Sequence, residues 1–257
     1  MPPPFPEKLR RRKISMSFFK NISSGFGKSA RLRRAAAEGD IDAVKRALAE
    51  GADVNAVDSA GGTALMYAAG YGVAETVDIL LAAGADIHAL DNDGWSALLA
   101  AVMGNNTAIV RRLLEAGANA NRATSDAGGG VTPLMAAAKQ HHAGIARILL
   151  EAGANPNATS HKSLGGVTAL WAAAFHGSTE IVKLLIEAGA DINAVDDSKQ
   201  TALKVATGEG RSDILALLLN AGADANIADK EGNTPLSLAR KMGNTDAIRL
   251  LEAAGAR

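Results

Sequence analysis

The chain has 257 residues, and its 27 basic and 27 acidic side chains cancel to a net charge of zero. Hydrophobic residues make up 47% of the chain but aromatic residues only 4%, which favours thin, closely packed helices over a core built on large rings. The absence of cysteine excludes disulfides and cysteine-based zinc sites, and no apolar run approaches the length that spans a membrane.

The N-terminal segment is strongly basic. Residues 1–34 hold ten Lys or Arg against Glu7 alone, a net +9, while the other 223 residues hold 17 basic and 26 acidic groups, a net −9. The segment opens Met-Pro-Pro-Pro-Phe-Pro, which lacks backbone donors for a helix or sheet, so we expect residues 1–28 to form a disordered leader when free. Lys20 interrupts its only apolar run, which argues against a signal peptide. A start at Met16 would remove its proline- and arginine-rich part.

Residues 29–58 are predicted to form a capping repeat of two helices. Asp40 is placed to cap the second helix. The outer face is expected to carry Arg31, Arg33 and Arg34, because a terminal repeat needs a polar side where it has no neighbour. The apolar positions that would line the two helices are Leu32, Ala35, Ala36, Ile41, Val44, Leu48 and Ala49.

A helical hairpin then recurs along the chain. Each copy opens with Thr or Ser, which can cap a helix, and closes with Gly-Ala-Asp or Gly-Ala-Asn, whose glycine can end one. The opening residues are Thr63, Ser96, Thr132, Thr168, Thr201 and Thr234, at intervals of 33, 36, 36, 33 and 33 residues. The closing glycines Gly51, Gly84, Gly117, Gly153, Gly189 and Gly222 keep the same period. Two signals with one spacing indicate a stacked array. Within one copy, Ser178 or Thr179 can cap the second helix.

The repeated unit resembles the ankyrin repeat, a 33-residue unit that opens T-P-L-H-x-A. The signature stands here as Thr132-Pro-Leu-Met-Ala-Ala, Thr168-Ala-Leu-Trp-Ala-Ala and Thr234-Pro-Leu-Ser-Leu-Ala. The resemblance covers residues 29–257 and implies an all-α ankyrin-repeat solenoid of stacked helix-turn-helix units with projecting β-hairpin-like loops, which we call fingers. It implies five inner repeats over about 59–229 and a C-terminal capping repeat over about 230–257. We expect a monomer.

Three features depart from the family pattern. Two fingers, 119–131 and 155–167, are longer by three residues, and such insertions often mark the binding side of a repeat protein. Asn105 and His141 replace the glycine between the two helices, and histidine tolerates a left-handed backbone less well. The signature histidine is replaced throughout, and we expect apolar contacts to replace its hydrogen bonds. The replacing residues are Met66, Leu99, Met135, Trp171, Lys204 and Ser237.

No catalytic or metal-binding constellation is predicted. Gly27-Lys28-Ser29 matches the end of a phosphate-binding loop, but the motif's first glycine would fall at Ile22 and no strand precedes it. His141 and His142 are adjacent, so their side chains diverge instead of converging on one ion. We expect no enzyme activity, no cofactor and no metal. The finger-base asparagines are expected to hydrogen-bond their own turns; they are Asn55, Asn121, Asn157, Asn193 and Asn226, with His88 in the equivalent position of one copy.

The resemblance implies that partners bind a concave face made by the first helices and the fingers. The aligned contact positions are Tyr71, Trp95, Met103, Lys139, Gln140, Phe175 and His176. The large apolar groups among them are expected to face solvent, and Trp, Tyr and Met are enriched in interface cores. The alternative is that each packs against a neighbouring finger. Trp171 is expected to lie half-buried as support for this face.

These features predict a non-catalytic module that binds a protein partner on its concave face. An alternative of another class is a tether to an anionic membrane surface, because residues 8–34 interleave basic groups with Phe18, Phe19 and Phe26. The acidic body disfavours nucleic acid. A third possibility is an organelle-targeted protein whose leader is a transit peptide rich in Arg and Ser. We expect a cytoplasmic protein unless the leader directs import.

Overall fold

The structure is a computed structural model, and it describes residues 27–257. These residues form fourteen α-helices and one short 3-10 helix, with no strand among them, which confirms the all-α fold. The predicted leader lies outside the described residues except for Gly27 and Lys28, the second of which already begins a helix. None of the described helices is long and apolar enough to cross a membrane. The chain divides into two compact units, one ending at Asn119 and one beginning at Ala120.

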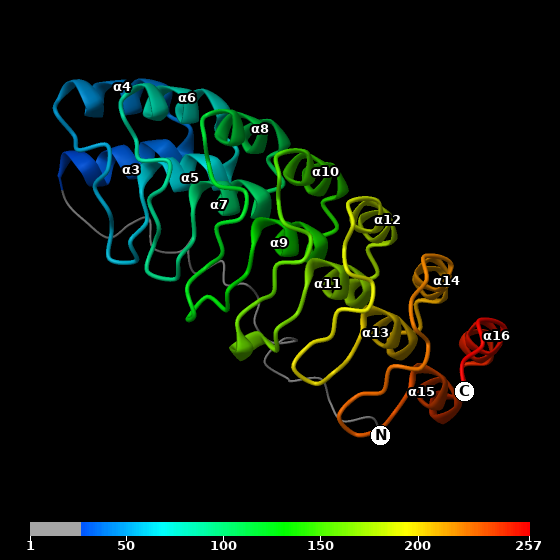
Figure 1. Ribbon diagram of the computed structural model, residues 1–257. Coiled ribbons are helices and arrows are strands. Elements are labelled where there is room, and N and C mark those ends of the chain that lie inside the picture. The colour runs from blue at the N-terminus through cyan, green and yellow to red at the C-terminus, as the bar shows by residue number, and fades with distance from the viewer. Residues whose placement is uncertain (1–26) are drawn as a thin grey trace. The chain divides into compact units, whose positions relative to one another are not determined.

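The first unit stacks three helical hairpins. In each hairpin the two helices pack against each other, and the first helices α3, α5 and α7 form one row while α4, α6 and α8 form a second (Figure 1). The short helices carry many alanines on the packed sides, so neighbouring hairpins approach closely. The helices are α3 (Lys28–Glu38), α4 (Ile41–Ala49), α5 (Ala64–Tyr71), α6 (Ala74–Ala82), α7 (Ala97–Met103) and α8 (Thr107–Glu115).

The second unit stacks four hairpins in the same manner. Its first helices α9, α11, α13 and α15 pack in one row, and α10, α12, α14 and α16 pack in the other (Figure 1). The 3-10 helix η1 (Lys162–Leu164) lies in the second long finger. The α-helices are α9 (Pro133–Lys139), α10 (Ala143–Glu151), α11 (Ala169–His176), α12 (Thr179–Glu187), α13 (Ala202–Gly208), α14 (Ser212–Asn220), α15 (Pro235–Met242) and α16 (Thr245–Ala253).

Side-chain caps start the first helix of each hairpin from α5 onward, as the repeated Thr or Ser predicts. Each hydroxyl accepts a hydrogen bond from the backbone N–H three residues later, at 3.1–3.3 Å. Asp40 caps α4 in the same way, accepting from the Ala43 N–H at 2.9 Å. Ser178, one of the two predicted caps of α12, takes the N-cap position, but its side chain does not cap the helix: the hydroxyl donates to the Ala138 carbonyl of the preceding hairpin at 2.8 Å.

The leucine of the opening signature lies in the core of every repeat. Leu65, Leu98, Leu134, Leu170, Leu203 and Leu236 are all at most 2% exposed. Three expectations for other side chains are corrected. On α4 the buried alanine is Ala47, not Ala49. Arg33 does not lie on the outer face: its side chain is buried and donates a hydrogen bond to the Ala56 carbonyl at 3.3 Å. Trp171 is fully buried, not half-buried.

Three residues other than glycine adopt a left-handed backbone. Asn105 (φ 55°) and His141 (φ 61°) do so between the helices of their hairpins, where their copies lack glycine, as predicted. Lys199 (φ 58°) does so in a finger, at the position that Gly166 occupies one repeat earlier and Gly232 one repeat later. A side chain with a Cβ is disfavoured in this conformation, so these positions carry local backbone strain.

The side-chain amides of the finger-base asparagines join successive repeats, which corrects the prediction that they serve their own turns; within the turn it is the backbone N–H that bonds, as from Asn55 to Asp53 Oδ1 at 2.9 Å. The Asn55 amide donates to the Gly84 carbonyl at 3.1 Å and accepts from the Asp86 N–H at 2.7 Å. Asn121 and Asn157 make the same pair of bonds to the repeat that follows each of them. An amide can satisfy a donor and an acceptor at once, which explains why asparagine recurs at this position.

Candidate functional site

The residues predicted to contact a partner fall into both units. In the first unit, Tyr71 ends α5, Met103 ends α7, and Trp95 lies in the finger before α7. In the second unit the row of first helices brings four of them together. Lys139 and Gln140 lie at the end of α9, and Phe175 and His176 lie at the end of α11, which packs directly against α9. All four are half-buried.

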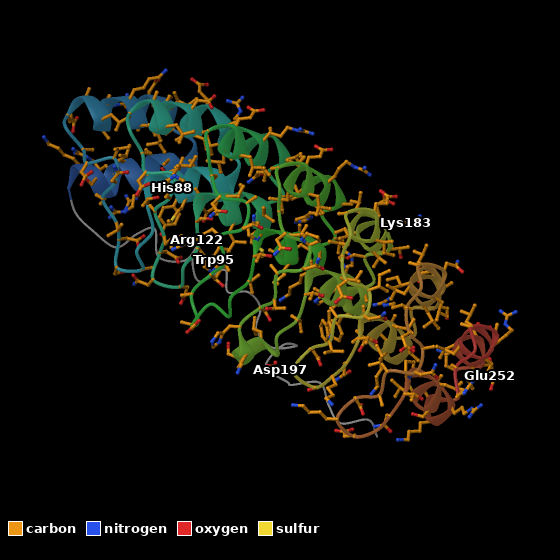
Figure 2. All side chains as sticks on the ribbon, viewed as in Figure 1. His88, Trp95, Arg122, Lys183, Asp197 and Glu252 are labelled. Carbon is orange, nitrogen blue, oxygen red and sulfur yellow. The ribbon has the colours of Figure 1, made fainter. Side chains whose placement is uncertain are left out.

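Trp95 does not face solvent, which corrects its predicted exposure. It is 7% exposed, and its backbone closes the turn of its finger: the N–H donates to Asp91 Oδ1 at 2.7 Å and the carbonyl accepts from the Asp91 N–H at 3.0 Å. Figure 2 labels Trp95 at the base of this finger. Such burial makes the indole a packing group that positions the finger, the alternative that the sequence left open.

Among the described residues of the first unit, Tyr71 is the exposed aromatic group, with 44% of its surface accessible. The end of its helix is held by the next hairpin, because the Asn106 amide donates to the Ala69 and Gly70 carbonyls at 2.8 and 3.0 Å. Gly104 is required there, since a Cβ on it would lie 2.3 Å from the Gly70 oxygen. Partial burial raises the pKa of the Tyr71 phenol, which therefore stays protonated and able to donate at neutral pH.

In the second unit an aromatic stack supports the exposed end of α11. The Trp171 ring, 4% exposed, stacks on Phe175 with centroids 5.3 Å apart and planes 17° from parallel. The His176 ring meets Phe175 edge-on, with centroids 4.9 Å apart and an interplanar angle of 89°. Both geometries are favourable for ring pairs. Phe175 is therefore held in one orientation, with Trp171 beneath it and His176 at its edge.

Hydrogen bonds connect the end of α9 to the turn after α11. The Ser178 hydroxyl lies 2.6 Å from His141 Nδ1 and donates to the Ala138 carbonyl at 2.8 Å. Because the single hydroxyl proton is used on the carbonyl, the His141 Nδ1 carries a proton and donates to Ser178. This bond holds the His141 ring at the left-handed turn that the sequence predicts to be strained.

Basic side chains dominate the electrostatics of this region. Burial lowers the pKa of His176 to about 4, with further lowering by the charges of Lys139, His141 and Arg211. Burial likewise lowers the pKa of Lys139, and burial and then the charge of His141 lower that of His142. Since a low pKa reflects a disfavoured protonated form, this surface resists gaining further positive charge in the absence of an anion.

Arg211 and Ser178 belong to this region although the sequence did not indicate either as a site residue. Arg211 precedes α14, and its guanidinium lies over Gly177, where a Cβ would come within 2.8 Å of its Cζ. The available signal was the repeat spacing, which places both residues in the turn between the helices of their hairpins. No cluster of three or more His, Asp or Glu that could hold a metal ion occurs within residues 27–257.

Comparisons with known proteins agree with this architecture. A family model described as "Ankyrin repeats (3 copies)" matches residues 32–124, 68–160, 122–196 and 170–257, which together run from 32 to 257. No curated protein sequence matches the chain.

Solved structures of three ankyrin repeat domains are similar to this chain. The domain of human ASB11 has a TM-score of 0.76 and 27% identity, covering 87% of this chain and 96% of its own. The domain of Bcl-3, described as a unique member of the IkappaB protein family, has a TM-score of 0.75 and 28% identity, covering 86% and 97%. A domain from Acinetobacter baumannii AYE has a TM-score of 0.69 and 36% identity, covering 75% and 98%.

Proposed function

Because the chain belongs to the ankyrin repeat family, we propose that it is a non-catalytic module that binds a partner protein through the exposed ends of its first helices. Ankyrin repeats generally act as protein-interaction modules. The proposed contact residues are Tyr71 and Met103 in the first unit and Lys139, Gln140, Phe175 and His176 in the second. Trp95 is excluded from this set because its side chain is buried.

The observation that carries the proposal is the stack of Phe175 on the buried Trp171, with the His176 ring at its edge. An aromatic side chain in a fixed orientation loses little conformational entropy when a partner covers it, so more of the contact energy remains as affinity. Large aromatic groups that fill a pocket on the partner are also the residues that most often dominate binding energy. Tyr71 is the corresponding anchor in the first unit.

Affinity capture from the native source tests the proposal. The full chain serves as bait in its natural form and as the variants Phe175→Ala and Tyr71→Ala. Val195→Ala is the matched control, since Val195 is a 46% exposed apolar residue in a finger and outside the proposed set. We expect specific proteins that are retained by the natural chain and the control but lost with Phe175→Ala or Tyr71→Ala. Equal retention by all four baits would contradict binding through the helix ends.

A second candidate function, a tether to an anionic membrane surface, is favoured by the net +9 of residues 1–34. Part of this charge is engaged within the first unit, where Arg31 pairs with Glu50 at 2.5 Å and Lys28 donates to the Glu50 carbonyl. A tether would therefore depend on the basic residues that precede the described part of the chain, among them Arg10, Arg11 and Arg12. Full-length protein should sediment with vesicles that contain phosphatidylserine. A variant in which glutamate replaces the three arginines should no longer sediment with them. Equal sedimentation of both forms would exclude the tether.

A further inference from the structure

The end of α11 in the second unit is surrounded by basic side chains from three consecutive hairpins. Lys139 ends α9, His141 follows it in the turn, His176 ends α11, and Arg211 lies in the turn before α14. Lys139, His141 and Arg211 all act electrostatically on His176. His141 is also hydrogen-bonded to Ser178, which lies two residues after His176 in the chain. We call Lys139, His141, His176 and Arg211 the basic cluster. It lies beside Phe175, whose ring His176 contacts.

We propose that the basic cluster binds a carboxylate side chain from an acidic segment of the partner protein, next to an apolar group that covers Phe175. This inference rests on the proposed function and specifies the chemistry of the partner at that surface. Basic groups of different reach meet at one place: the His141 ring is held by its hydrogen bond to Ser178, and the Arg211 guanidinium lies over Gly177. A side chain that is already held loses little entropy when an anion binds.

Charge balance within the second unit also favours an incoming anion. The following hairpin carries Glu209 at the end of α13 and Asp213 in the first turn of α14. Asp213 accepts a hydrogen bond from the Thr179 hydroxyl at 2.5 Å, and this bond and then the Arg211 charge lower its pKa. On His176, by contrast, every charge that acts is positive. An anion that binds beside His176 would offset these positive charges.

Binding of such a carboxylate should take up a proton. The free His176 has a pKa of about 4 because burial and like charges oppose its protonation. A nearby carboxylate favours the charged imidazole and raises this pKa. By linkage the bound state holds more protons than the free state, so affinity for the acidic segment should rise as the pH falls from neutral towards 5. Replacement of His176 by Gln should remove this dependence.

A random peptide library displayed on phage, selected against the full-length chain and counter-selected against its Phe175→Ala variant, tests the inference. We expect the Phe175-dependent peptides to be enriched in Asp or Glu near an apolar residue. A synthetic copy with its acids replaced by amides should bind more weakly. Lys139→Gln and Arg211→Gln should each weaken the acidic peptide about two- to fivefold. Lys183→Gln should not; this exposed lysine, labelled in Figure 2, lies on α12 and outside the cluster.

The possible failures of this experiment are distinguishable. Phe175-dependent peptides that lack acids and bind Lys139→Gln and Arg211→Gln normally would overturn the acidic partner and leave protein binding intact. A complete lack of Phe175-dependent peptides would count against the proposed function at this surface and against the inference together. A single-stranded oligonucleotide that binds and is lost with the same two variants would also overturn the inference, because it would assign the cations to phosphates. Thermal melting of each variant verifies that the chain remains folded.

Discussion

Lys204 and Asp229 form an ion pair in the interior of the second unit, with the ammonium donating to Asp229 Oδ2 and side chains only 4% and 10% exposed. Lys204 occupies the place of the signature histidine on α13, and Asp229 opens the following finger. The other oxygen of Asp229 accepts the Glu231 and Asn233 N–H groups, each at 2.9 Å. The lysine therefore links a helix to the next finger by charge, and the predicted apolar replacement of the histidine is wrong at this repeat.

Removal of the ammonium should destabilise the fold strongly. Lys204→Met places an apolar residue where Met66 and Met135 stand in other repeats, but it leaves the Asp229 carboxylate buried without its cation. We expect a loss of about 3 kcal/mol in the free energy of unfolding, measured by urea denaturation. The double variant Lys204→Met/Asp229→Asn should recover most of this loss, since the amide oxygen can still accept the finger N–H groups. A single variant as stable as the natural chain would show that the pair contributes nothing.

The same pair predicts how stability depends on pH. Burial alone would raise the pKa of Asp229, but the bond from Lys204 and the backbone N–H groups lower it below its usual value. A carboxyl whose pKa is depressed by folding contributes stability above its unfolded pKa of about 3.9. That contribution is lost as the pH falls through the folded value. The natural chain should therefore lose stability relative to the double variant, which has no carboxyl at this position, between about pH 5 and about pH 2. A constant difference would contradict the ion pair.

The period of the sequence was sufficient to predict the helices and the side-chain caps of the first helices, because these features depend on neighbours within one repeat. The Thr168 hydroxyl, for example, reaches an N–H only three residues away. Other features depend on side chains a whole repeat apart. Asn157 bonds Asp191 and Gly189, and Lys204 meets Asp229, so the stacking geometry had to be known before either partner could be assigned.

The candidate surface was predicted in part for the same reason. Alignment to the repeat identifies Phe175 and His176 as residues at the end of a first helix, which the structure confirms. It does not say whether a finger side chain turns towards solvent or towards the core, and the Trp95 indole turns inwards. Arg211 joins the surface because Gly177 has no side chain to exclude it. This contact involves two residues in different repeats, so the pattern within one repeat could not predict it.

Thr76 should be replaceable with a gain in stability. Its side chain on α6 is completely buried, and its hydroxyl has no hydrogen-bond partner. The equivalent positions of α8, α10, α12 and α14 hold Ile109, Ile145, Ile181 and Ile214. Thr76→Val should stabilise the fold by about 1 kcal/mol, because it removes an unsatisfied buried polar group. As the matched control, Thr63→Val should cost about 1 kcal/mol, since the Thr63 hydroxyl caps α5. Chemical denaturation of both variants tests this prediction, and a loss of stability in Thr76→Val would contradict it.

Lys199 should likewise be better replaced by glycine. It holds a left-handed backbone at φ 58°, and its N–H donates to the Asp196 carbonyl to close the finger turn. Glycine adopts this conformation without the steric cost that a Cβ brings, so Lys199→Gly should stabilise the fold by about 1 kcal/mol. Gly232→Ala introduces the opposite change at the matching position, φ 78°, where no other atom would obstruct the methyl group. Gly232→Ala should destabilise the fold by a similar amount. If thermal melting shows that both variants change the melting temperature in the same direction, backbone strain is not the cause.

Trp95 and Phe175 should separate stability from binding. Trp95→Ala removes a buried indole from the base of a finger, so it should lower the free energy of unfolding by about 3–5 kcal/mol. Binding of the native partner, measured per folded molecule, should remain close to that of the natural chain. Phe175→Ala removes a half-buried ring at the end of α11, and we expect a loss of about 2 kcal/mol or more in binding free energy. Its melting temperature should change less than that of Trp95→Ala, since Trp171 beneath it remains enclosed by the neighbouring helices.

Calorimetric titration with the captured partner, combined with thermal melting, distinguishes the two effects. The reverse result, in which Trp95→Ala abolishes binding but leaves stability unchanged, would show that the finger containing Trp95 is part of the binding surface of the first unit.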